Sequence, residues 1–468
     1  MTQTTTVTAL AVALAAIALV ARLVGFQAAP PANAKAGGAQ QALTPERVVR
    51  LGEDLTPIGA ERAGNAAGSI PGWTGGLPKS PPVDWSVGYT DPFVGEQPLF
   101  TITAANAEKY KTILSPGHLA IFKRDRLSFR MNVYPSHRSA AYPQDVMDEV
   151  KQHAGQSIED GHHIRNVGRT TVPFPIPQDG LQVMWNHVFR WRGGSFERQF
   201  VWAPVAPTGG FYIVRVRLNV AFDQQGYVHD SRPDRLYNAN QFFLSPPSAI
   251  GYRQVQWEPI DPLGTYRIRW LHVTQTLDDR RLPSYEYDTI EPYTGGLRDA
   301  DQNDGWNGAP DRYNWELVGK QERLIGYNGY KLADRTLKYP EIIRAHHLNP
   351  DLLRYERHRV WVVEATLRKG RAERLYRRIF YVDEDTWQVA QEEVYNKKGR
   401  MTRFGDHHMI QFYDVLVPWY AVTIHHDMVT GAYLVQYLDN QEAFPPRWGF
   451  RARIADYLPS NLRSLGLP

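Results

Sequence analysis

Residues 374–399 read RLYRRIFYVDEDTWQVAQEEVYNKKG. Two runs rich in aromatic and β-branched residues, 374–382 and 387–395, are separated by the turn-forming tract DEDT, and NKKG follows the second. Strands joined by such short connections must be antiparallel, because parallel pairing needs a long crossover. The stretch therefore predicts one hairpin of an antiparallel meander.

The same alternation of apolar and polar residues recurs along the chain. It predicts further strands at 181–192, 211–218, 265–277, 359–367, 411–417, 421–427 and 432–438. Gly193-Gly194 is typical of a hairpin turn after the first of these runs. Helices are expected only at 104–114 and 144–153.

A meander with so many aromatic residues must close, pack on another sheet or be capped by helices, because exposed sheet edges and faces aggregate. The predicted fold class is therefore mainly β (α+β): a large curved antiparallel sheet or incomplete β-barrel, with helices covering its concave face.

The N-terminal region is expected to be an export leader followed by extended coil. Residues 7–20 are apolar, and the small residues Ala32-Asn33-Ala34 suggest cleavage before Lys35. Because no Lys or Arg precedes Val7, an uncleaved inner-membrane anchor stays open. The domain prediction is a signal peptide or anchor at 1–34, a Gly/Pro-rich extended segment packed on the main body at 35–98, and one main domain at 99–468. Trp73, Trp85 and Phe93 are the expected anchors of the extended segment.

Composition excludes several classes of protein. The chain has no cysteine, which excludes disulfides, thiolate metal sites and a lipidated N-terminal Cys. The formal charge of +4, from 53 basic and 49 acidic residues, is too near balance for a nucleic-acid binder. The expected location is the periplasm.

Motifs of catalysis are mostly missing. Nucleophile elbows, zinc-protease helices and phosphate loops do not occur. The tract from Asp299 begins like a calcium loop but has Asp304 and Pro310 at its sixth and twelfth positions, so a solvated turn is expected there.

Clusters of histidine and of acidic residues likewise predict no catalytic or metal site. Eight of the 15 histidines form the doublets 162–163, 346–347, 407–408 and 425–426. They are expected to lie at the surface or in turns, because neighbours on a strand face opposite sides and cannot chelate one metal together. The carboxylates at 383–385 and 392–393 are expected at hairpin tips. No catalytic residue, cofactor or metal site is predicted.

The sequence evidence that favours ligand binding is a set of aromatic residues distributed over several predicted strands. Aromatic rings bury large areas, and they either form core or line an apolar pocket on a concave sheet. The residues expected to contact a hydrophobic ligand are Trp185, Phe189, Trp191, Trp270 and Trp361.

Several tracts closely resemble the bacterial family called domain of unknown function 1329. Examples are LTPIGAERAGNAAGSIPGWTGGL at 55–77, FPIPQDGLQVMWNHVFRWRGGSFER at 174–198 and NGAPDRYNWELVGK at 307–320. The resemblance implies a fold similar to the periplasmic lipoprotein carriers, an open β-barrel covered by helices over 99–468. Members are frequently encoded beside an outer-membrane β-barrel protein and a resistance-nodulation-division type exporter. The resemblance thus implies traffic of a lipid or other hydrophobic molecule, with those two proteins as partners.

Three hypotheses follow. The first is a non-enzymatic periplasmic carrier for a lipid or other hydrophobic molecule, accessory to an envelope export system. The second is a hydrolase using Asp311, His187 and His137. The third is a ligand-free structural adaptor of an efflux assembly.

Overall fold

The computed structural model describes residues 50–230, 232–273, 276, 278–282 and 287–462. They belong to one compact unit that spans 42–468. The predicted mainly β fold is confirmed, because 17 strands form a single sheet and helices are few in the part of the chain described. None of the described helices is long and apolar enough to span a bilayer.

The elements have the following bounds. The strands of the main sheet are β1 (Phe100–Thr103), β2 (Arg130–Val133), β5 (Ser195–Val205), β6 (Val214–Phe222), β8 (Arg235–Phe243), β9 (Tyr252–Pro259), β10 (Ile268–Val273), β11 (Asp278–Arg281), β12 (Tyr313–Gly326), β13 (Tyr355–Leu367), β14 (Arg377–Asp383), β15 (Val389–Tyr395), β16 (Met401–Asp406), β17 (His408–Phe412), β18 (Val417–Asp427), β19 (Tyr433–Leu438) and β20 (Arg447–Trp448). Two small sheets pair β3 (Ile158–Asp160) with β4 (His163–Arg165) and β7 (Val228–His229) with β21 (Ala452–Arg453). The α-helices are α3 (Pro116–Arg124), α4 (Gln144–His153), α5 (Gly180–Phe189) and α6 (Tyr339–Ile342). Short 3₁₀ helices are η1 (Ala107–Tyr110), η2 (Ala300–Gln302), η3 (Pro310–Arg312), η4 (Tyr330–Ala333), η5 (Pro350–Leu352), η6 (Ile454–Tyr457) and η7 (Pro459–Asn461).

Seven strands of the main sheet form a ring. Neighbouring strands pair antiparallel in the order β12, β13, β14, β15, β16, β18 and β17. The ring closes where β17 meets β12 through one parallel pair, Gly326 with His408. A Cβ atom at Gly326 would overlap the His408 ring, so glycine permits this close approach.

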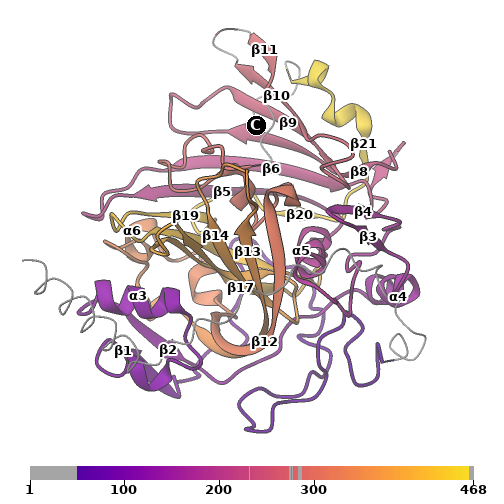
Figure 1. Cartoon of the computed structure of the whole chain (residues 1–468). Helices are drawn as coiled ribbons and strands as arrows, with labels where there is room; N and C mark the ends of the chain where they lie inside the picture. Colours follow the sequence, from indigo (N-terminus) through magenta and orange to yellow (C-terminus); the bar gives the residue numbers. More distant parts are fainter. Residues whose placement is uncertain (1–49, 231, 274–275, 277, 283–286, 463–468) are drawn as a thin grey trace, which may run out of the picture. The chain divides into compact units, whose positions relative to one another are not determined.

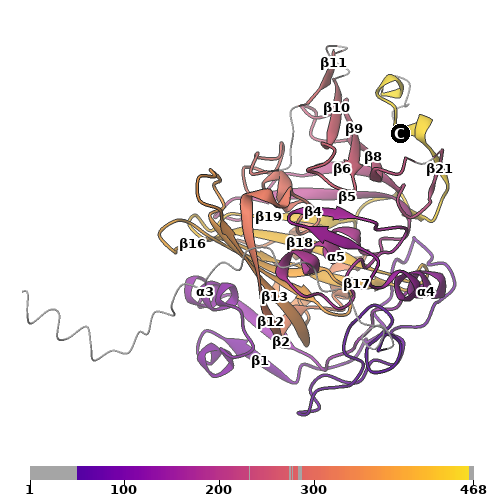
Figure 2. The same ribbon diagram turned by 45° about the vertical axis from the view of Figure 1, so that its right-hand side comes forward.

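The other large part of the sheet extends from the ring through β19. Strand β19 pairs with β18 on one side and with β5 on the other, and β6, β8, β9, β10 and β11 follow in antiparallel order. Figure 1 shows these strands, from magenta to rose, above the brown and orange strands of the ring, and Figure 2 shows the same arrangement from a second side. We call β5, β6, β8 and β9 the upper sheet.

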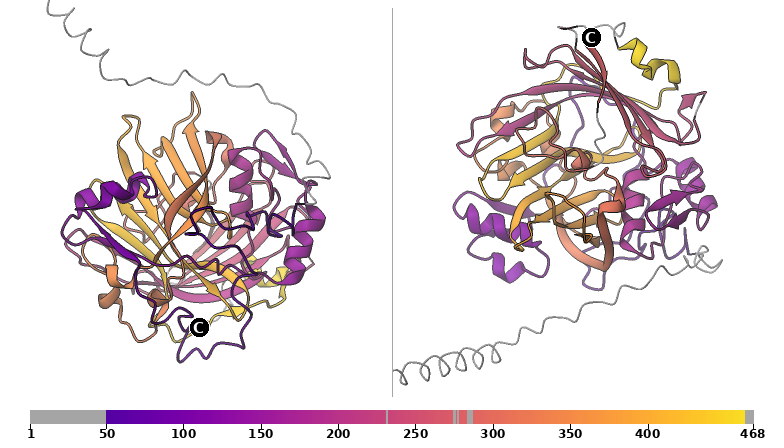
Figure 3. Two further views of the ribbon diagram at one scale, coloured as in Figure 1. Left: turned by 90° about the horizontal axis from the view of Figure 1, so that it is seen from below. Right: turned by 45° about the horizontal axis from the view of Figure 1, so that its top comes forward.

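Residues 50–98 contain no named helix or strand and run as coil along the main body (Figure 3). The Trp73 indole donates to the Ala140 carbonyl at 3.0 Å, and the Trp85 indole donates to the Glu442 carbonyl at 3.2 Å. Phe93 stacks on the ring of His137 at 4.1 Å. These three contacts join the segment to distant parts of the chain, while its standing as a separate segment from residue 35 stays a prediction.

The predicted strand at 181–192 is wrong, because residues 180–189 form helix α5. The Asp179 side chain accepts a hydrogen bond from the backbone N–H of Gln182 and caps the helix. All ten residues of α5 are buried. Since the helix needs no polar face, its sequence lacks the 3.6-residue periodicity that identifies a surface helix. Gly193 and Gly194, both at positive φ, then lead into β5.

Other boundaries differ from the expected ones. Helix α4 occupies the predicted 144–153, whereas 104–114 contains only the short η1. The predicted strand at 411–417 is wrong over most of its length, because β17 ends at Phe412 and a turn leads into β18. Residue 277, the end of another predicted strand, lies outside the described residues.

Candidate ligand-binding cavity

Alternation along the upper sheet places one set of side chains on its concave face. Phe196 and Phe200 point to this face from β5, and Val220, directly opposite Phe196, points there from β6. Ala239 continues the row on β8, where it lies opposite Val220. Because successive side chains of a strand face opposite sides, the concave face is apolar across three neighbouring strands.

These side chains line a cavity of about 60 Å³, which we call the concave cavity. Its lining consists of Arg192, Phe196, Phe200, Trp202, Leu218, Val220, Phe222, Tyr237, Ala239, Gln241, Gln254, Gln256, Asn303, Asp304, Asn307, Trp419 and Tyr437. The space is smaller than the roughly 150 Å³ cavity that admits benzene. The expected apolar hollow is therefore largely filled, and a larger ligand needs the covering segment 303–307 to move.

Amide side chains form the polar part of the lining. Asn307 donates to the Tyr237 hydroxyl at 3.0 Å, and Gln256 donates to the same oxygen at 3.2 Å. The Nε2 atom of Gln241 is buried and has no hydrogen-bond partner among the described residues. An unpaired buried donor is unfavourable by about 1–3 kcal/mol, so the cavity wall offers a site for a ligand oxygen.

Asp304 fixes the segment that covers the cavity. Its carboxylate accepts hydrogen bonds from Arg190 at 2.6 Å, from Arg192 at 2.5 Å and from the Trp419 indole at 2.8 Å. Burial would raise the pKa of Asp304, but the two guanidinium groups outweigh burial and lower the pKa to about 2. The covering segment is therefore held by a carboxylate that stays charged at neutral pH.

His187 on α5 holds the same segment from the other side. Its Nε2 atom lies 2.9 Å from the Asp304 carbonyl oxygen, and its Nδ1 atom lies 2.9 Å from the Trp387 carbonyl oxygen. Burial, and after it the charge of Arg190, lowers the pKa of His187 well below the usual value. A neutral imidazole held between two backbone segments has a structural role.

The five aromatic residues expected to contact a ligand lie outside the lining of the concave cavity. Trp185 and Phe189 are buried on α5 with ring centroids 6.3 Å apart. Trp191 lines a separate space of about 160 Å³ near α4. Trp270 on β10 packs against the core on the convex side of the upper sheet, and Trp361 on β13 stacks on Trp387. The structure does not gather the five at one place, and contact between any of them and a ligand stays a prediction.

Sequence reasoning missed most of the lining because it did not identify β5. The segment SFERQFVW at 195–202 alternates Phe196, Phe200 and Trp202 with polar or smaller residues, so its period-2 pattern was available as a signal. Asn303, Asp304 and Asn307 belong to the covering segment, whose position no periodicity indicates.

A second apolar space lies beside residues 87–97. This outer groove has a volume of about 550 Å³, within the usual range for ligand pockets. It is lined by Val87, Tyr89, Thr90, Asp91, Phe93, Val94, Gly95, Glu96, Gln97, Tyr134, Asn328, Tyr330, Lys331, Asp334, Thr336, Leu337, Leu352 and Arg354. Charged residues interrupt its apolar surface.

The side chains proposed for a hydrolase are not assembled into one site. His137 bonds Glu96 at 2.7 Å, and Asp311 accepts from the Tyr287 hydroxyl at 2.6 Å. His187 contacts backbone atoms of Asp304, Trp306, Trp387 and Val389 and lies 3.5 Å from the Arg190 guanidinium group. Within the described residues no hydrogen bond or ion pair joins any two of the three. The geometry gives no support to the hydrolase hypothesis.

The expected solvated turn from Asp299 is wrong, because Asp299 and Asp301 are buried in ion pairs. Arg374 and Arg403 bond the Asp299 carboxylate, and Arg378 bonds Asp301. The two acidic residues here bind guanidinium groups from β14, from β16 and from the residues just before β14. The acidic residues of this tract are therefore the counter-ions of arginines that are distant in the sequence.

Two histidine doublets differ from the expected surface positions. His407, His408, His425 and His426 are all buried. Burial lowers the pKa of each, to about 4 for His407, so the four imidazoles are neutral at pH 7. The rings of His407 and His425 contact each other, with centroids 5.1 Å apart, and the ring of His426 stacks on Phe404 and Tyr433.

Comparison with known proteins identifies relatives over nearly the whole chain. The sequence profile described as protein of unknown function (DUF1329) matches residues 101–463. An uncharacterized protein of Pseudomonas aeruginosa is 41% identical over 433 residues, which cover 91% of this chain and 94% of that protein. The predicted family resemblance is thus confirmed.

Solved structures give only weak likenesses. A putative outer membrane lipoprotein-sorting protein domain from Vibrio parahaemolyticus has a TM-score of 0.42 and 10% identity, over 61% of this chain and 98% of that one. A DUF1329 family protein from Desulfovibrio piger has a TM-score of 0.40 and 12% identity, over 58% and 92% of the two chains. A LolA superfamily protein from Nitrosomonas europaea has a TM-score of 0.33 and 12% identity, over 56% and 91%. With TM-scores this low, the functional argument depends on the cavity itself.

Proposed function

The chain belongs to the DUF1329 family of proteins, and from the concave cavity we propose that it binds an amphipathic lipid without transforming it. The observation that carries the proposal is the lining, which combines an aromatic wall with the unpaired amide of Gln241. A ligand with an apolar body and one oxygen acceptor matches both features.

Apolar burial would supply the affinity. Each square ångström of apolar surface removed from water contributes roughly 25 cal/mol before the costs of ordering. Phe196, Phe200 and Trp202 offer flat apolar surfaces, and a hydrogen bond from Gln241 to a carboxyl or ester oxygen would fix the orientation. Fatty acids and their esters are the chemical class that this combination favours.

Entry of such a ligand requires the covering segment to move. Residues 303–307 lie over the cavity and are held chiefly by Asp304 and His187. We propose that this segment opens as a lid, and that the ion pairs of Asp304 with Arg190 and Arg192 hold it closed when no ligand enters. On this proposal the cavity is small because the lid is closed, and opening of the lid would enlarge it.

The cellular role that we propose is based on the predicted export leader and on the family resemblance. The chain would act in the periplasm as a carrier accessory to an envelope export system, with an outer-membrane β-barrel protein and a resistance-nodulation-division type exporter as partners. The apolar run at 7–20 supports export. Contact of the ligand with Trp185, Phe189, Trp191, Trp270 or Trp361 is a further part of the proposal that binding data can test.

The test is a binding measurement on wild type and two variants at Ala239. Native mass spectrometry and lipid extraction identify co-purified lipid, and titration with oleic acid measures affinity. We expect Ala239→Phe, which fills the cavity, to weaken binding at least tenfold and Ala239→Ser to bind like wild type. Equal affinity in all three would place the ligand elsewhere. A folded wild type that neither carries nor binds lipid would favour the ligand-free adaptor.

A further inference from the structure

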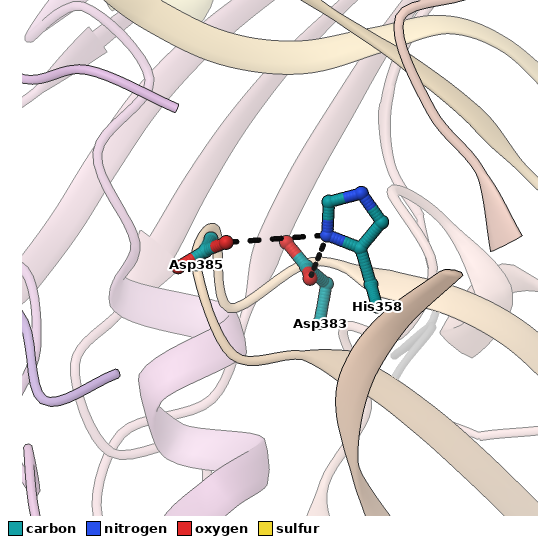
Figure 4. Close-up of side chains that lie close together, drawn as sticks. All are labelled: His358, Asp383 and Asp385. Atoms are coloured by element: carbon teal, nitrogen blue, oxygen red, sulfur yellow. Dashed lines mark ion pairs between the residues drawn. The ribbon is translucent and has the colours of Figure 1, made fainter. Parts of the chain in front are cut away.

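His358 and the turn after β14 form a buried cluster outside the concave cavity. The Nδ1 atom of His358 on β13 lies 3.8 Å from an Asp383 oxygen and 3.9 Å from an Asp385 oxygen. All three side chains are almost completely buried. Figure 4 shows both carboxylates and the imidazole nitrogen pointing toward one small space.

Two polar atoms at this cluster have no hydrogen-bond partner among the described residues. They are the Oδ1 atom of Asp383 and the hydroxyl of Tyr327. The Tyr327 ring stacks on His358 with a centroid separation of 3.9 Å. Buried polar groups are normally satisfied, so an unpaired carboxylate oxygen facing an imidazole nitrogen points to a missing partner that is positively charged.

We propose that His358, Asp383 and Asp385 bind one divalent transition-metal cation, of which Zn²⁺ is the best match. One imidazole and two carboxylates are ligands of the kind that zinc takes in proteins. Metal–ligand bonds of about 2.1 Å in a tetrahedral site put the ligand atoms about 3.4 Å apart. The two nitrogen–oxygen separations would therefore have to shorten by about 0.5 Å on binding, and the separation of the two carboxylate oxygens, which is at most 4.8 Å, by up to about 1.4 Å.

Arg138 positions one of the ligands. Its guanidinium group donates to both oxygens of Asp385, at 2.8 Å from Nε and 2.6 Å from Nη2. Glu356 positions His358. Its carboxylate lies 3.3 Å from Nε2 of the imidazole, which leaves Nδ1 directed at the two aspartates. Groups that orient metal ligands in this way are a regular part of metal sites.

The charges around the cluster favour a cation. Counting the ion-paired network gives six carboxylates against four permanent cations. The carboxylates are Glu61, Glu96, Glu356, Asp383, Glu384 and Asp385, and the cations are Arg138, Lys320, Arg354 and Arg359. The difference, six minus four, is two negative charges. One divalent cation, or protonation of two groups, neutralises it.

Hydrogen bonds join the cluster to the wall of the outer groove. Asn328 and Arg354 line the groove, and both donate to Glu356, at 3.0 and 2.6 Å. His358 lies directly behind Glu356. The site is thus two hydrogen bonds from an open space, and the proposal is independent of lipid binding.

The experiment measures metal binding by the full chain without an affinity tag. After EDTA treatment and dialysis, Zn²⁺ and, separately, Mn²⁺ are titrated calorimetrically, and bound metal is quantified by elemental analysis. Co²⁺ provides a visible absorption spectrum that reports the coordination geometry. We expect one equivalent of Zn²⁺ or Co²⁺ per chain and a rise in melting temperature on binding.

Variants distinguish this site from adventitious binding. Asp383→Asn and His358→Asn should reduce the affinity at least a hundredfold, whereas His163→Asn should bind like wild type, because His163 belongs to a partly exposed pair with Asp261 outside the cluster. Asp383→Asn keeps the shape of the side chain and preserves folding, which circular dichroism checks. Folded wild type with no bound equivalent, or unchanged affinity in folded Asp383→Asn, would overturn the proposal.

Discussion

Asp304 and Arg190 stand 114 residues apart in the chain, and their side chains meet at 2.6 Å in the protein interior. The contact joins the residue that follows α5 to the segment covering the concave cavity. Arg192 and Trp419 add their donors to the same carboxylate. One acidic side chain thereby connects a helix end, a sheet strand and the lid.

Asp304→Asn should destabilise the protein by about 3–5 kcal/mol at pH 7, because two buried guanidinium groups lose their counter-ion. The folded pKa of Asp304 is lowered to about 2, below the unfolded value. Its stabilisation is therefore present above pH ~4 and is lost as pH falls toward 2. Urea unfolding of wild type and variant should show a difference that shrinks over this range. Asp160→Asn, in the exposed pair with Arg165, is the control and should change stability little.

Gln241→Leu should have opposite effects on stability and on binding. Removing an unpaired buried amide donor should leave the free protein as stable or up to about 1–3 kcal/mol more stable. Affinity for oleic acid should fall, since the ligand loses its hydrogen bond, while affinity for an alkane of equal length should not. Thermal unfolding and ligand titration measure the two effects. If the variant lost affinity for oleic acid and for the alkane to the same extent, a hydrogen bond between Gln241 and the ligand would be contradicted.

Gly117→Ala tests the packing of α3 on β16. A Cβ atom at residue 117 would overlap the ring of Phe404. Overpacking of this kind costs about 1–3 kcal/mol, so the midpoint of urea unfolding should decrease. Gly210→Ala, where a Cβ meets no close neighbour, should leave the midpoint nearly unchanged.

His407→Asn should weaken the pH dependence of stability in mild acid. Burial lowers the pKa of His407 to about 4, whereas the unfolded chain binds this proton near pH 6.5. Stability should therefore decrease as pH falls from 6.5 to 4, and the variant should lack this share of the decrease. Asparagine can still accept the Ile424 N–H, as Nδ1 of His407 does now. His229→Asn, at an exposed position, should leave the pH profile as it is.

The sequence predicted the sheet better than the cavity, and the reason is physical. Strands such as 387–395 have local turns and a period of two, which are visible in the sequence. Helix α5 is buried on all sides, so its pattern carried no helical signal. Asp304 is held at the cavity by Arg190, Arg192 and Trp419, which are distant in the sequence, and such long-range contacts leave no local sequence pattern. The cluster of His358 with Asp383 and Asp385 likewise depends on strand register, which the sequence does not specify.

Strand β19 is inserted between two parts of the chain that are made at very different times. Its residues 433–438 pair with β18, which has just been synthesised, and with β5, whose residues 195–205 were completed much earlier. Until β19 emerges from the ribosome, one edge of β5 has no strand to pair with and can template aggregation. A chain truncated before residue 433 should therefore depend on a chaperone that shields this edge. The sheet therefore cannot be completed between β5 and β18 until β19 has been synthesised, long after β5.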